Sequence, residues 1–107
     1  MLAVIFKMFQ GGWVYIMTNQ WNNVLYVGVT SNLSVRVRQH NEQNSTLSFT
    51  TKYLVYKLVY YAWFPTIEEA IAEEKWIKGG SRLKKIKLVN EMNPEWENLA
   101  DTLRDNV

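Results

Sequence analysis

Two short runs of aromatic and β-branched residues, separated by a polar turn, limit what this chain can fold into more than any other feature. Trp13 to Thr18 and Val24 to Thr30 have the composition of β-strands. The intervening Asn19-Gln20-Trp21-Asn22 is typical of a turn. The pattern therefore predicts a β-hairpin with a loop of about four residues.

The register of this hairpin decides which side chains share a face of the sheet. The short loop places Thr18 opposite Asn23 and Tyr15 opposite Tyr26. Directly opposed residues point to the same face, whereas a slip by one residue would put the two tyrosines on opposite faces. We therefore expect Tyr15 and Tyr26 to share one face.

The middle of the chain predicts a helix, a loop and a third strand. Ser31 or Asn32 can cap a helix that runs to about Glu42. The polar stretch from Asn41 to Lys52 indicates a loop, and the aromatic and β-branched stretch from Tyr53 to Trp63 indicates a strand.

Two further helices are expected after Pro65. A capping-box pattern, Thr66-Ile67-Glu68-Glu69, begins a helix that should reach about Lys78 and end at Gly79-Gly80. Ser81 can cap a last helix to about Met92, where Pro94 blocks its continuation. The final residues are polar and are expected to fray.

Composition excludes several classes of protein. The length of 107 residues allows one domain and leaves little room for a second. The chain has no cysteine, so disulfides, thiolate metal sites and cysteine catalysis are excluded. The apolar start, Met1 to Phe9, is too short to span a bilayer and lacks the features of a signal peptide. Secretion and membrane insertion are therefore not expected, and the absence of cysteine is compatible with a reducing cytosol.

The charges are segregated along the chain, although the net charge is only +2. Thr66 to Glu74 contains four acids and no base, and Lys75 to Leu88 contains six bases and no acid. A cationic segment beside an acidic one could hold a polyanion next to a metal ion. The alternative is an ordinary solvated helix face.

One carboxylate lies where an apolar side chain is expected. At 100° per residue, an apolar stripe runs along the helix after Pro65, with Glu74 almost at its centre. The stripe consists of Ile67, Ala70, Ile71 and Ile77. A carboxylate that faces a core needs a partner, a hydrogen-bond network or a metal ion. The sequence leaves open whether Glu74 is a partnered core residue or a functional carboxylate in a cleft.

Other residues are less informative when taken singly. Gly28 within a strand often marks a bulge or a close backbone approach. Arg36 and His40 lie four residues apart and share one helix face. His40 is the only histidine and, without further His or Cys, cannot build a typical zinc site.

Taken in order, these residues resemble the GIY-YIG nuclease family, and more narrowly its small single-domain bacterial members of poorly defined role. The similarity rests on Val14-Tyr15-Ile16, then Tyr26-Val27-Gly28, then Arg36 and His40 on one helix, and Glu74 on a later helix. Further matching stretches are residues 25–31, 49–53, 57–61, 68–72 and 92–96. The resemblance covers about residues 12–99, so one domain is expected over residues 1–107, with extensions at 1–11 and 100–107.

The resemblance implies an α+β fold, a central three-stranded antiparallel sheet flanked by helices, which agrees with the elements expected above. It also implies a divalent-metal-dependent endonuclease that hydrolyses phosphodiester bonds of DNA. The catalytic residues that it implies are Tyr15, Tyr26, Arg36, His40 and Glu74. Glu74 would hold one Mg²⁺ or Mn²⁺ ion, and Arg36 would bind the scissile phosphate.

Some roles stay open within this resemblance. Either tyrosine could position the attacking water or take its proton, and His40 could assist that transfer or orient a hydroxyl. Val14 stands where the first motif usually has glycine, and Glu73 adds negative charge beside Glu74. The family also uses an asparagine near the end of the domain, for which Asn90 and Asn93 are both candidates.

The expected substrate is DNA rather than RNA, bound with low sequence specificity. Basic side chains would contact backbone phosphates without reading bases, and the candidates are Arg38, Lys52, Lys75, Lys78, Arg82, Lys84 and Lys85. Single strands, flaps or branches would be the preferred forms, in DNA repair or recombination. The alternatives are a non-catalytic nucleic-acid-binding module and a protein-interaction role using Trp21, Trp63 or Trp76. Nothing indicates a dimer interface, so a monomer is the default.

Overall fold

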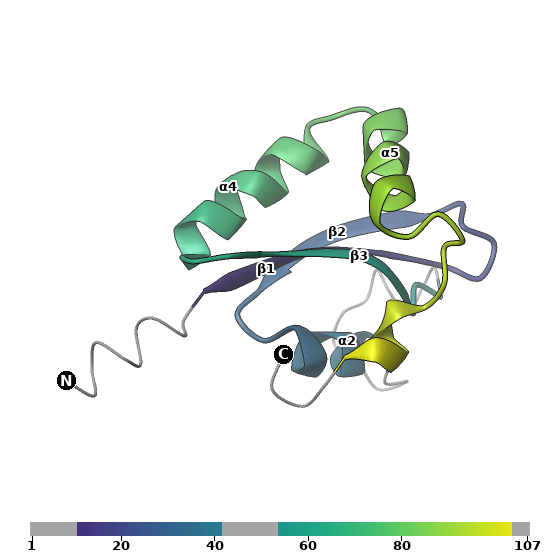
Figure 1. The fold of residues 1–107 in the computed structure, drawn as a ribbon, viewed down its shortest axis with the longest axis horizontal. Coiled ribbons are helices and arrows are strands. Elements are labelled where there is room, and N and C mark those ends of the chain that lie inside the picture. The colour runs from purple at the N-terminus through teal and green to yellow at the C-terminus, as the bar shows by residue number, and fades with distance from the viewer. Residues whose placement is uncertain (1–10, 42–53, 104–107) are drawn as a thin grey trace.

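The computed structural model describes residues 11–41 and 54–103. Helices cover both faces of one sheet (Figure 1). The elements, in chain order, are β1 (Gly12–Thr18), β2 (Leu25–Thr30), α2 (Leu33–Asn41), β3 (Lys57–Phe64), α4 (Ile67–Lys78), α5 (Arg82–Met92) and a 3₁₀ turn, η1 (Leu99–Thr102). Within these residues no helix is long and apolar enough to cross a membrane.

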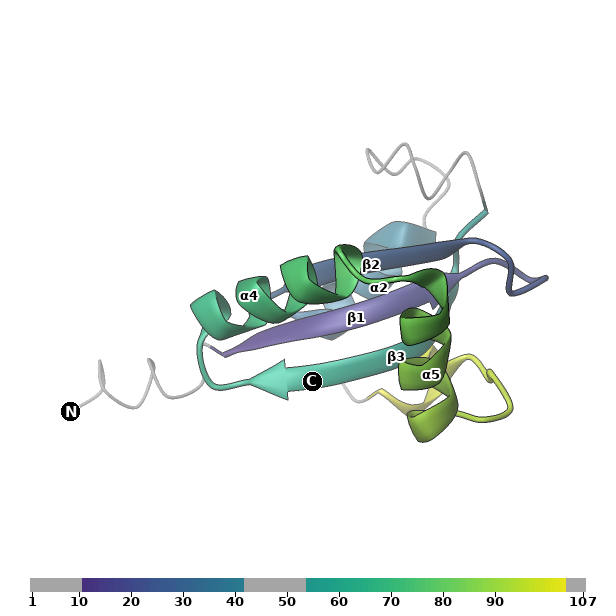
Figure 2. The ribbon, with the colours of Figure 1, turned by 90° about the horizontal axis from the view of Figure 1, so that it is seen from above.

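The sheet has three antiparallel strands in the order β2-β1-β3 (Figure 2). The α+β fold with a central three-stranded antiparallel sheet is therefore confirmed. Because β1 is the central strand, β2 forms one edge of the sheet, and α4 crosses above β1 and β2. Residues on α4 can thus approach the β2 edge.

The expected hairpin register is wrong by two residues. Thr18 pairs with Leu25, and Tyr15 pairs with Gly28 rather than with Tyr26. The connection is longer than expected because Thr18 Oγ1 donates to the carbonyl of Val24, 2.7 Å away, which keeps Val24 out of the strand. A shift by two preserves side-chain parity, so Tyr15 and Tyr26 still share one face.

Each face of the sheet has its own apolar cluster. Under α4 and α5 lie the buried residues Val14, Ile16, Val27, Val59, Ala70, Ile77 and Val89. The opposite face, towards α2 and η1, buries Tyr15, Met17, Leu33, Val37, Val55 and Leu58. Alternation along β1 supplies both clusters, since Val14 and Ile16 face one way and Tyr15 and Met17 the other.

The helix caps are confirmed. Asn32 accepts a bond from the backbone of Val35, and the Thr66 hydroxyl accepts one from Glu69. Ser81 caps α5 in the same way through the N–H of Lys84. The expected end of the first helix at Glu42, and most of the loop that follows, lie outside the described residues.

Two other expectations need correction. The third strand begins at Lys57 rather than near Tyr53, because Leu54 has a left-handed φ of 56° and so cannot continue a strand. Tyr53 itself lies outside the described residues. Ile71 of the expected apolar stripe is exposed, so the buried stripe of α4 is narrower and rests mainly on Ala70 and Ile77.

Candidate active site

Three aromatic rings from three elements meet on the α2 face of the sheet. The hydroxyl of Tyr15 on β1 lies 2.9 Å from Nε2 of His40 on α2, within hydrogen-bonding distance. The ring of Tyr26 on β2 stands edge-on to His40, with centroids 5.0 Å apart, and lies 6.3 Å from the Tyr15 ring. The structure therefore brings together three of the five residues expected to form the site.

Gly28 leaves the space that the Tyr15 ring occupies. A Cβ atom at position 28 would lie 2.4 Å from both Cζ and Oη of Tyr15. Glycine in mid-strand indicated a close approach, and the close approach is made by the tyrosine directly opposite on β1. The second motif thus supplies a tyrosine and, two residues later, the space for the tyrosine of the first motif.

The buried tyrosine and histidine are both held in their neutral forms. Burial, together with the neighbouring Tyr26, raises the pKa of the Tyr15 hydroxyl far above its ordinary value. Burial and the charge of Arg36 lower the pKa of His40 to about 4. At neutral pH the two groups therefore share one neutral hydrogen bond, whose direction depends on the histidine tautomer.

The second ring nitrogen of His40 is unusual. His40 is only 4% exposed, and no group among the described residues hydrogen-bonds its Nδ1. A buried polar atom without a partner costs about 1–3 kcal/mol. Within the described residues the imidazole is therefore held through Nε2, which contacts the Tyr15 hydroxyl.

Arg36 lies one helical turn before His40 on α2 and is half-buried. Its positive charge acts on both members of the Tyr15–His40 pair, since it opposes the rise in the Tyr15 pKa and contributes to the fall in the His40 pKa. The expected placement of Arg36 and His40 beside one another is thus observed, and the guanidinium supplies the positive charge of the site.

Glu74 approaches the cluster from the other side of the sheet, on α4. Its side chain is only 14% exposed, and its Oε2 forms an ion pair with Nζ of Lys78, 3.2 Å away. The charge of Glu74 also contributes, as the smallest cause, to the raised pKa of Tyr15, which is mainly due to burial. Periodicity predicted a carboxylate facing inward, and the (i, i+4) spacing to Lys78 was the sequence signal for its partner.

Glu73 faces elsewhere, although it is the adjacent acid. Its charge contributes, after burial, to the raised pKa of Tyr60 on β3. Successive residues of a helix point about 100° apart, so the two neighbouring carboxylates act on tyrosines of different strands. Of the two, Glu74 is the carboxylate whose charge acts on Tyr15.

The donor set determines what kind of cation this site could hold. No group of three or more His, Asp or Glu side chains converges within the described residues. A zinc site is therefore not formed there. A single carboxylate fits Mg²⁺ or Mn²⁺, which keep several waters and complete their shell with substrate phosphate oxygens.

Seven basic residues were expected to contact phosphate. Of these, Arg38 on α2 and Lys75 on α4 are exposed. Lys52 lies outside the described residues. The others make intramolecular contacts: Lys78 with Glu74, Arg82 with the Asn23 carbonyl, Lys84 with the Trp76 ring and Lys85 with the Gly80 carbonyl. The segment that is basic in sequence is therefore partly used to fasten α4, α5 and the hairpin together.

The two candidate asparagines have different structural contacts. Asn93 is buried, and its amide nitrogen donates to the carbonyls of Val59 and Glu97. Asn90 is exposed and accepts a bond from the indole of Trp96. Asn98, which the sequence did not single out, accepts a bond from the backbone N–H of Leu58. Its signal was a polar residue directly before Leu99-Ala100, which is too common to be specific.

Comparisons with known proteins identify a domain family and a relative. Residues 11–87 match the sequence profile of the GIY-YIG catalytic domain. A UPF0213 protein of Clostridium perfringens is 33% identical over 86 residues, which cover 80% of this chain and 90% of that protein. No solved structure matches significantly.

Proposed function

The chain belongs to the family of GIY-YIG catalytic domains, and on this premise we propose that it is a divalent-metal-dependent endonuclease. Its substrate is DNA, cut with low sequence specificity and preferably in single-stranded or branched forms. We place this activity in DNA repair or recombination in the bacterial cytoplasm, as the resemblance implies.

The observation that carries the proposal is the convergence of Tyr15, Tyr26 and His40 at one point of the sheet. Charges of opposite sign act on that point, from Arg36 on α2 and from Glu74 on α4. A hydrolytic site for a phosphodiester needs a cationic group for the phosphate, an anionic group for a metal ion and a hydroxyl to orient water. Arg36, Glu74 and the tyrosine hydroxyls would supply these three groups.

The two tyrosines take different roles in this proposal. The raised pKa of Tyr15 keeps its proton in place, so Tyr15 serves as a fixed hydrogen-bonding group and not as a base. Tyr26 is more exposed than Tyr15 and contacts the same histidine ring. We assign the positioning of the attacking water to Tyr26, and to His40 the orientation of Tyr15.

The charged residues act on the phosphate. Arg36 binds its oxygens bidentately and stabilises the charge that accumulates in the transition state. Glu74 would hold one Mg²⁺ or Mn²⁺ ion. Such an ion, when bound, neutralises charge on the phosphate and on the leaving oxygen.

The test is a cleavage assay on labelled single-stranded, duplex and flapped DNA, with Mg²⁺, Mn²⁺ or a chelator. Glu74→Gln is compared with Glu73→Gln, which removes the same charge from the adjacent position. We expect metal-dependent cleavage by the wild type and by Glu73→Gln, and its loss in Glu74→Gln. Circular dichroism checks that both variants are folded.

The other outcomes separate the alternatives. A folded wild-type protein that binds DNA and never cuts it would support the non-catalytic binding module instead. Cleavage by Glu74→Gln at the wild-type rate would refute the assignment of Glu74 to the metal.

A further inference from the structure

The turn between β1 and β2 presents an exposed indole on a well-braced loop. Trp21 is 64% exposed. Asn19 Nδ2 donates to Asn23 Oδ1 at 2.6 Å, and the backbone N–H of Asn23 donates to Asn19 Oδ1 at 3.1 Å. Asn22 has a left-handed φ of 57°, which asparagine tolerates well. A large aromatic side chain is thus exposed on a loop whose backbone is fixed by several bonds.

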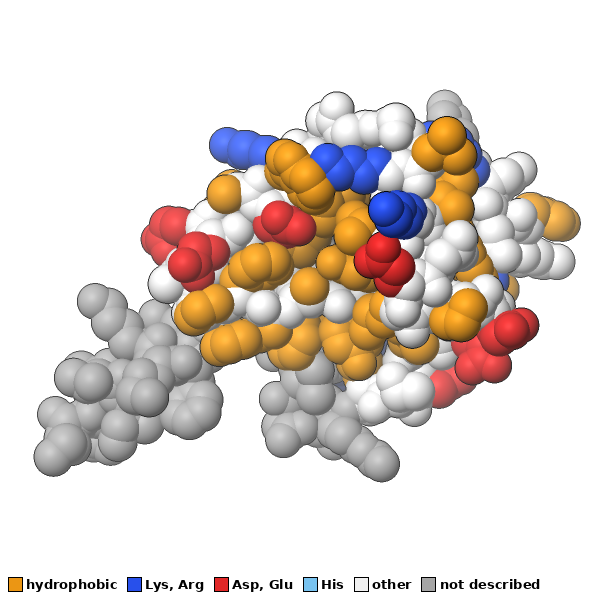
Figure 3. Space-filling model, turned by 45° about the horizontal axis from the view of Figure 1, so that its top comes forward, with side chains coloured by type: hydrophobic (Ala, Val, Ile, Leu, Met, Phe, Trp, Pro, Cys, Tyr) orange, Lys and Arg blue, Asp and Glu red, His pale blue; other side chains and the backbone are white. Residues whose placement is uncertain are grey.

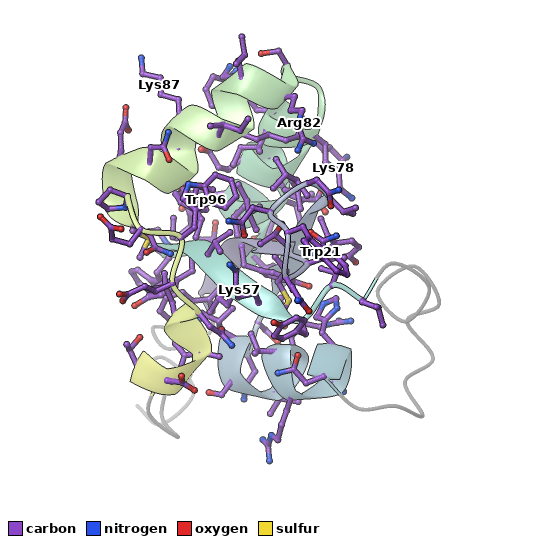
Figure 4. The ribbon with its side chains drawn as sticks, turned by 90° about the vertical axis from the view of Figure 1, so that its right-hand side faces the viewer. Trp21, Lys57, Lys78, Arg82, Lys87 and Trp96 are labelled. Atoms are coloured by element: carbon purple, nitrogen blue, oxygen red, sulfur yellow. The ribbon has the colours of Figure 1, made fainter. Side chains whose placement is uncertain are left out.

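Cationic groups lie beside this turn. Arg82 at the start of α5 donates from Nη2 to the carbonyl of Asn23, 2.9 Å away. Figure 4 shows Trp21, Arg82 and Lys78 on the same side of the molecule. A guanidinium has five N–H donors, and the bond to Asn23 uses one of them. Arg82 can therefore brace the turn and still bind a phosphate.

This cationic side continues to the candidate active site. Lys78, on the last turn of α4, forms the ion pair with Glu74. Tyr26 follows Trp21 by five positions, which is at most about 17 Å of extended backbone. A nucleic acid strand that contacts Trp21, Arg82 and Lys78 would therefore pass beside Glu74, the carboxylate of the candidate site.

The other exposed indoles fit a base less well. Nζ of Lys84 lies 3.0 Å from the ring centroid of Trp76 and covers one face of it. Trp63 pairs with Trp13 near the start of β1, at the end of the sheet opposite the turn. Figure 3 shows apolar side chains spread over the α4 and α5 side, with most of the visible Lys and Arg in the upper half of the view. Of these three indoles, Trp21 is therefore the one whose turn is bonded to Arg82, on the side of the molecule that also carries Lys78.

We propose that the Asn19–Asn23 turn is a subsite for single-stranded DNA, in which an unpaired base stacks on Trp21 and the flanking phosphates bind Arg82 and Lys78. Bases in a duplex have both faces covered by their neighbours, whereas an unpaired base can stack on an aromatic side chain. The subsite rests on the proposed nuclease function and specifies it, because it selects unpaired strands next to the cluster.

The test is binding of fluorescein-labelled oligothymidylate, followed by anisotropy in the presence of a chelator so that no cleavage occurs. Base–aromatic stacking is strong enough that Trp21→Ala should weaken single-strand binding on the order of 10-fold. Affinity for duplex DNA should change little. Trp63→Ala is the matched control and should bind as the wild type does. An unchanged melting temperature of Trp21→Ala shows that the exposed side chain is not needed for folding.

Arg82→Gln provides an independent readout. Loss of one phosphate contact lowers the salt dependence of binding by roughly one unit of the log–log slope, less for single strands. Stacking does not move this slope, so Trp21→Ala should leave it unchanged. An unchanged slope in Arg82→Gln would overturn the assignment of Arg82.

Several results would overturn the subsite itself. The first is that Trp21→Ala binds oligothymidylate with wild-type affinity. The second is that Trp21→Ala loses equal affinity for single strands and for duplex DNA. The third is that Trp21→Ala weakens binding only to oligouridylate. Failure of the proposed function would look different, because a chain that never cuts DNA could still show the Trp21-dependent preference for single strands. If the wild type binds no nucleic acid, the subsite is refuted and Trp21 becomes a candidate protein contact.

Discussion

Replacing Gly28 with alanine tests the geometry of the candidate site without relying on activity. The added Cβ would lie 2.4 Å from Cζ and Oη of Tyr15, so the ring must move. Gly28 does not have a positive φ, so the tyrosine ring rather than the backbone conformation excludes a side chain there. Movement of the ring also breaks the hydrogen bond between Tyr15 and His40.

The size of the effect follows from three contributions to the free energy of unfolding. Overpacking in a buried site costs about 1–3 kcal/mol, and loss of the buried hydrogen bond costs about 0.5–1.5 kcal/mol. The better strand propensity of alanine offsets about 0.5–1 kcal/mol. The net destabilisation is about 0.5–4 kcal/mol. At a central value of about 2 kcal/mol, the melting temperature of a domain of this size falls by roughly 8–16 °C.

The assay is thermal and urea unfolding followed by circular dichroism, combined with proton NMR of the imidazole. His40 is the only histidine, so its ring signals report directly on the contact with Tyr15. Gly79→Ala is the control, because its Cβ would lie 3.4 Å from the nearest atom and its φ of −76° suits alanine. That variant should be stabilised by about 0.4–1 kcal/mol. A Gly28→Ala protein with wild-type stability and an unmoved His40 signal would refute the packing argument.

Three further changes test the neighbouring interactions. The pKa of His40 is about 4 in the folded protein against 6.5 in the unfolded chain, so protonation favours unfolding. The contribution of neutral His40 to the free energy of unfolding is therefore complete above about pH 6.5 and is lost towards pH 4. The total loss is about 3 kcal/mol. Urea unfolding should show this loss in the wild type and not in His40→Gln. Asn93→Ala should lower the free energy of unfolding by about 2 kcal/mol or more, because Asn93 is buried and bonded to Val59 and Glu97. Asn90 is exposed, so Asn90→Ala should lower it by less than about 1 kcal/mol. Equal unfolding midpoints of the two variants in urea would contradict this distinction. Tyr15→Phe should raise the pKa of His40, because the hydroxyl bond holds the imidazole in its buried position. NMR titration of the imidazole measures that shift, and an unchanged pKa would contradict this role of the bond.

The helices and their ends were largely predictable because their signals are local. Thr66 and Ser81 cap α4 and α5 through bonds to residues three positions later, and these spacings are visible in the sequence. The beginning of β3 was not predictable in this way. Leu54 to Tyr56 are as apolar and aromatic as a strand, and only the left-handed φ of Leu54 shows that the chain turns there.

The hairpin register was missed because it depends on contacts within the turn. Composition indicates where a turn lies, but the bond from Thr18 to Val24 and the paired amides of Asn19 and Asn23 determine its length. The error of two residues left the shared face of Tyr15 and Tyr26 intact. It did misassign the partner of Tyr15, which is Gly28, and so concealed why glycine is needed there.

The position of Glu74 could be predicted from periodicity, whereas the exposure of its side chain and of its partner Lys78 could not. Its ion pair with Lys78 joins two residues of one helix, and Lys78 is 53% exposed. Such pairs contribute only about 0.3–0.5 kcal/mol. A divalent ion interacts with a carboxylate more strongly than one ammonium does, because its charge is twice as large. Lys78 is therefore a weak competitor for Glu74, and its release would place a cationic side chain beside the carboxylate, where a phosphate would bind.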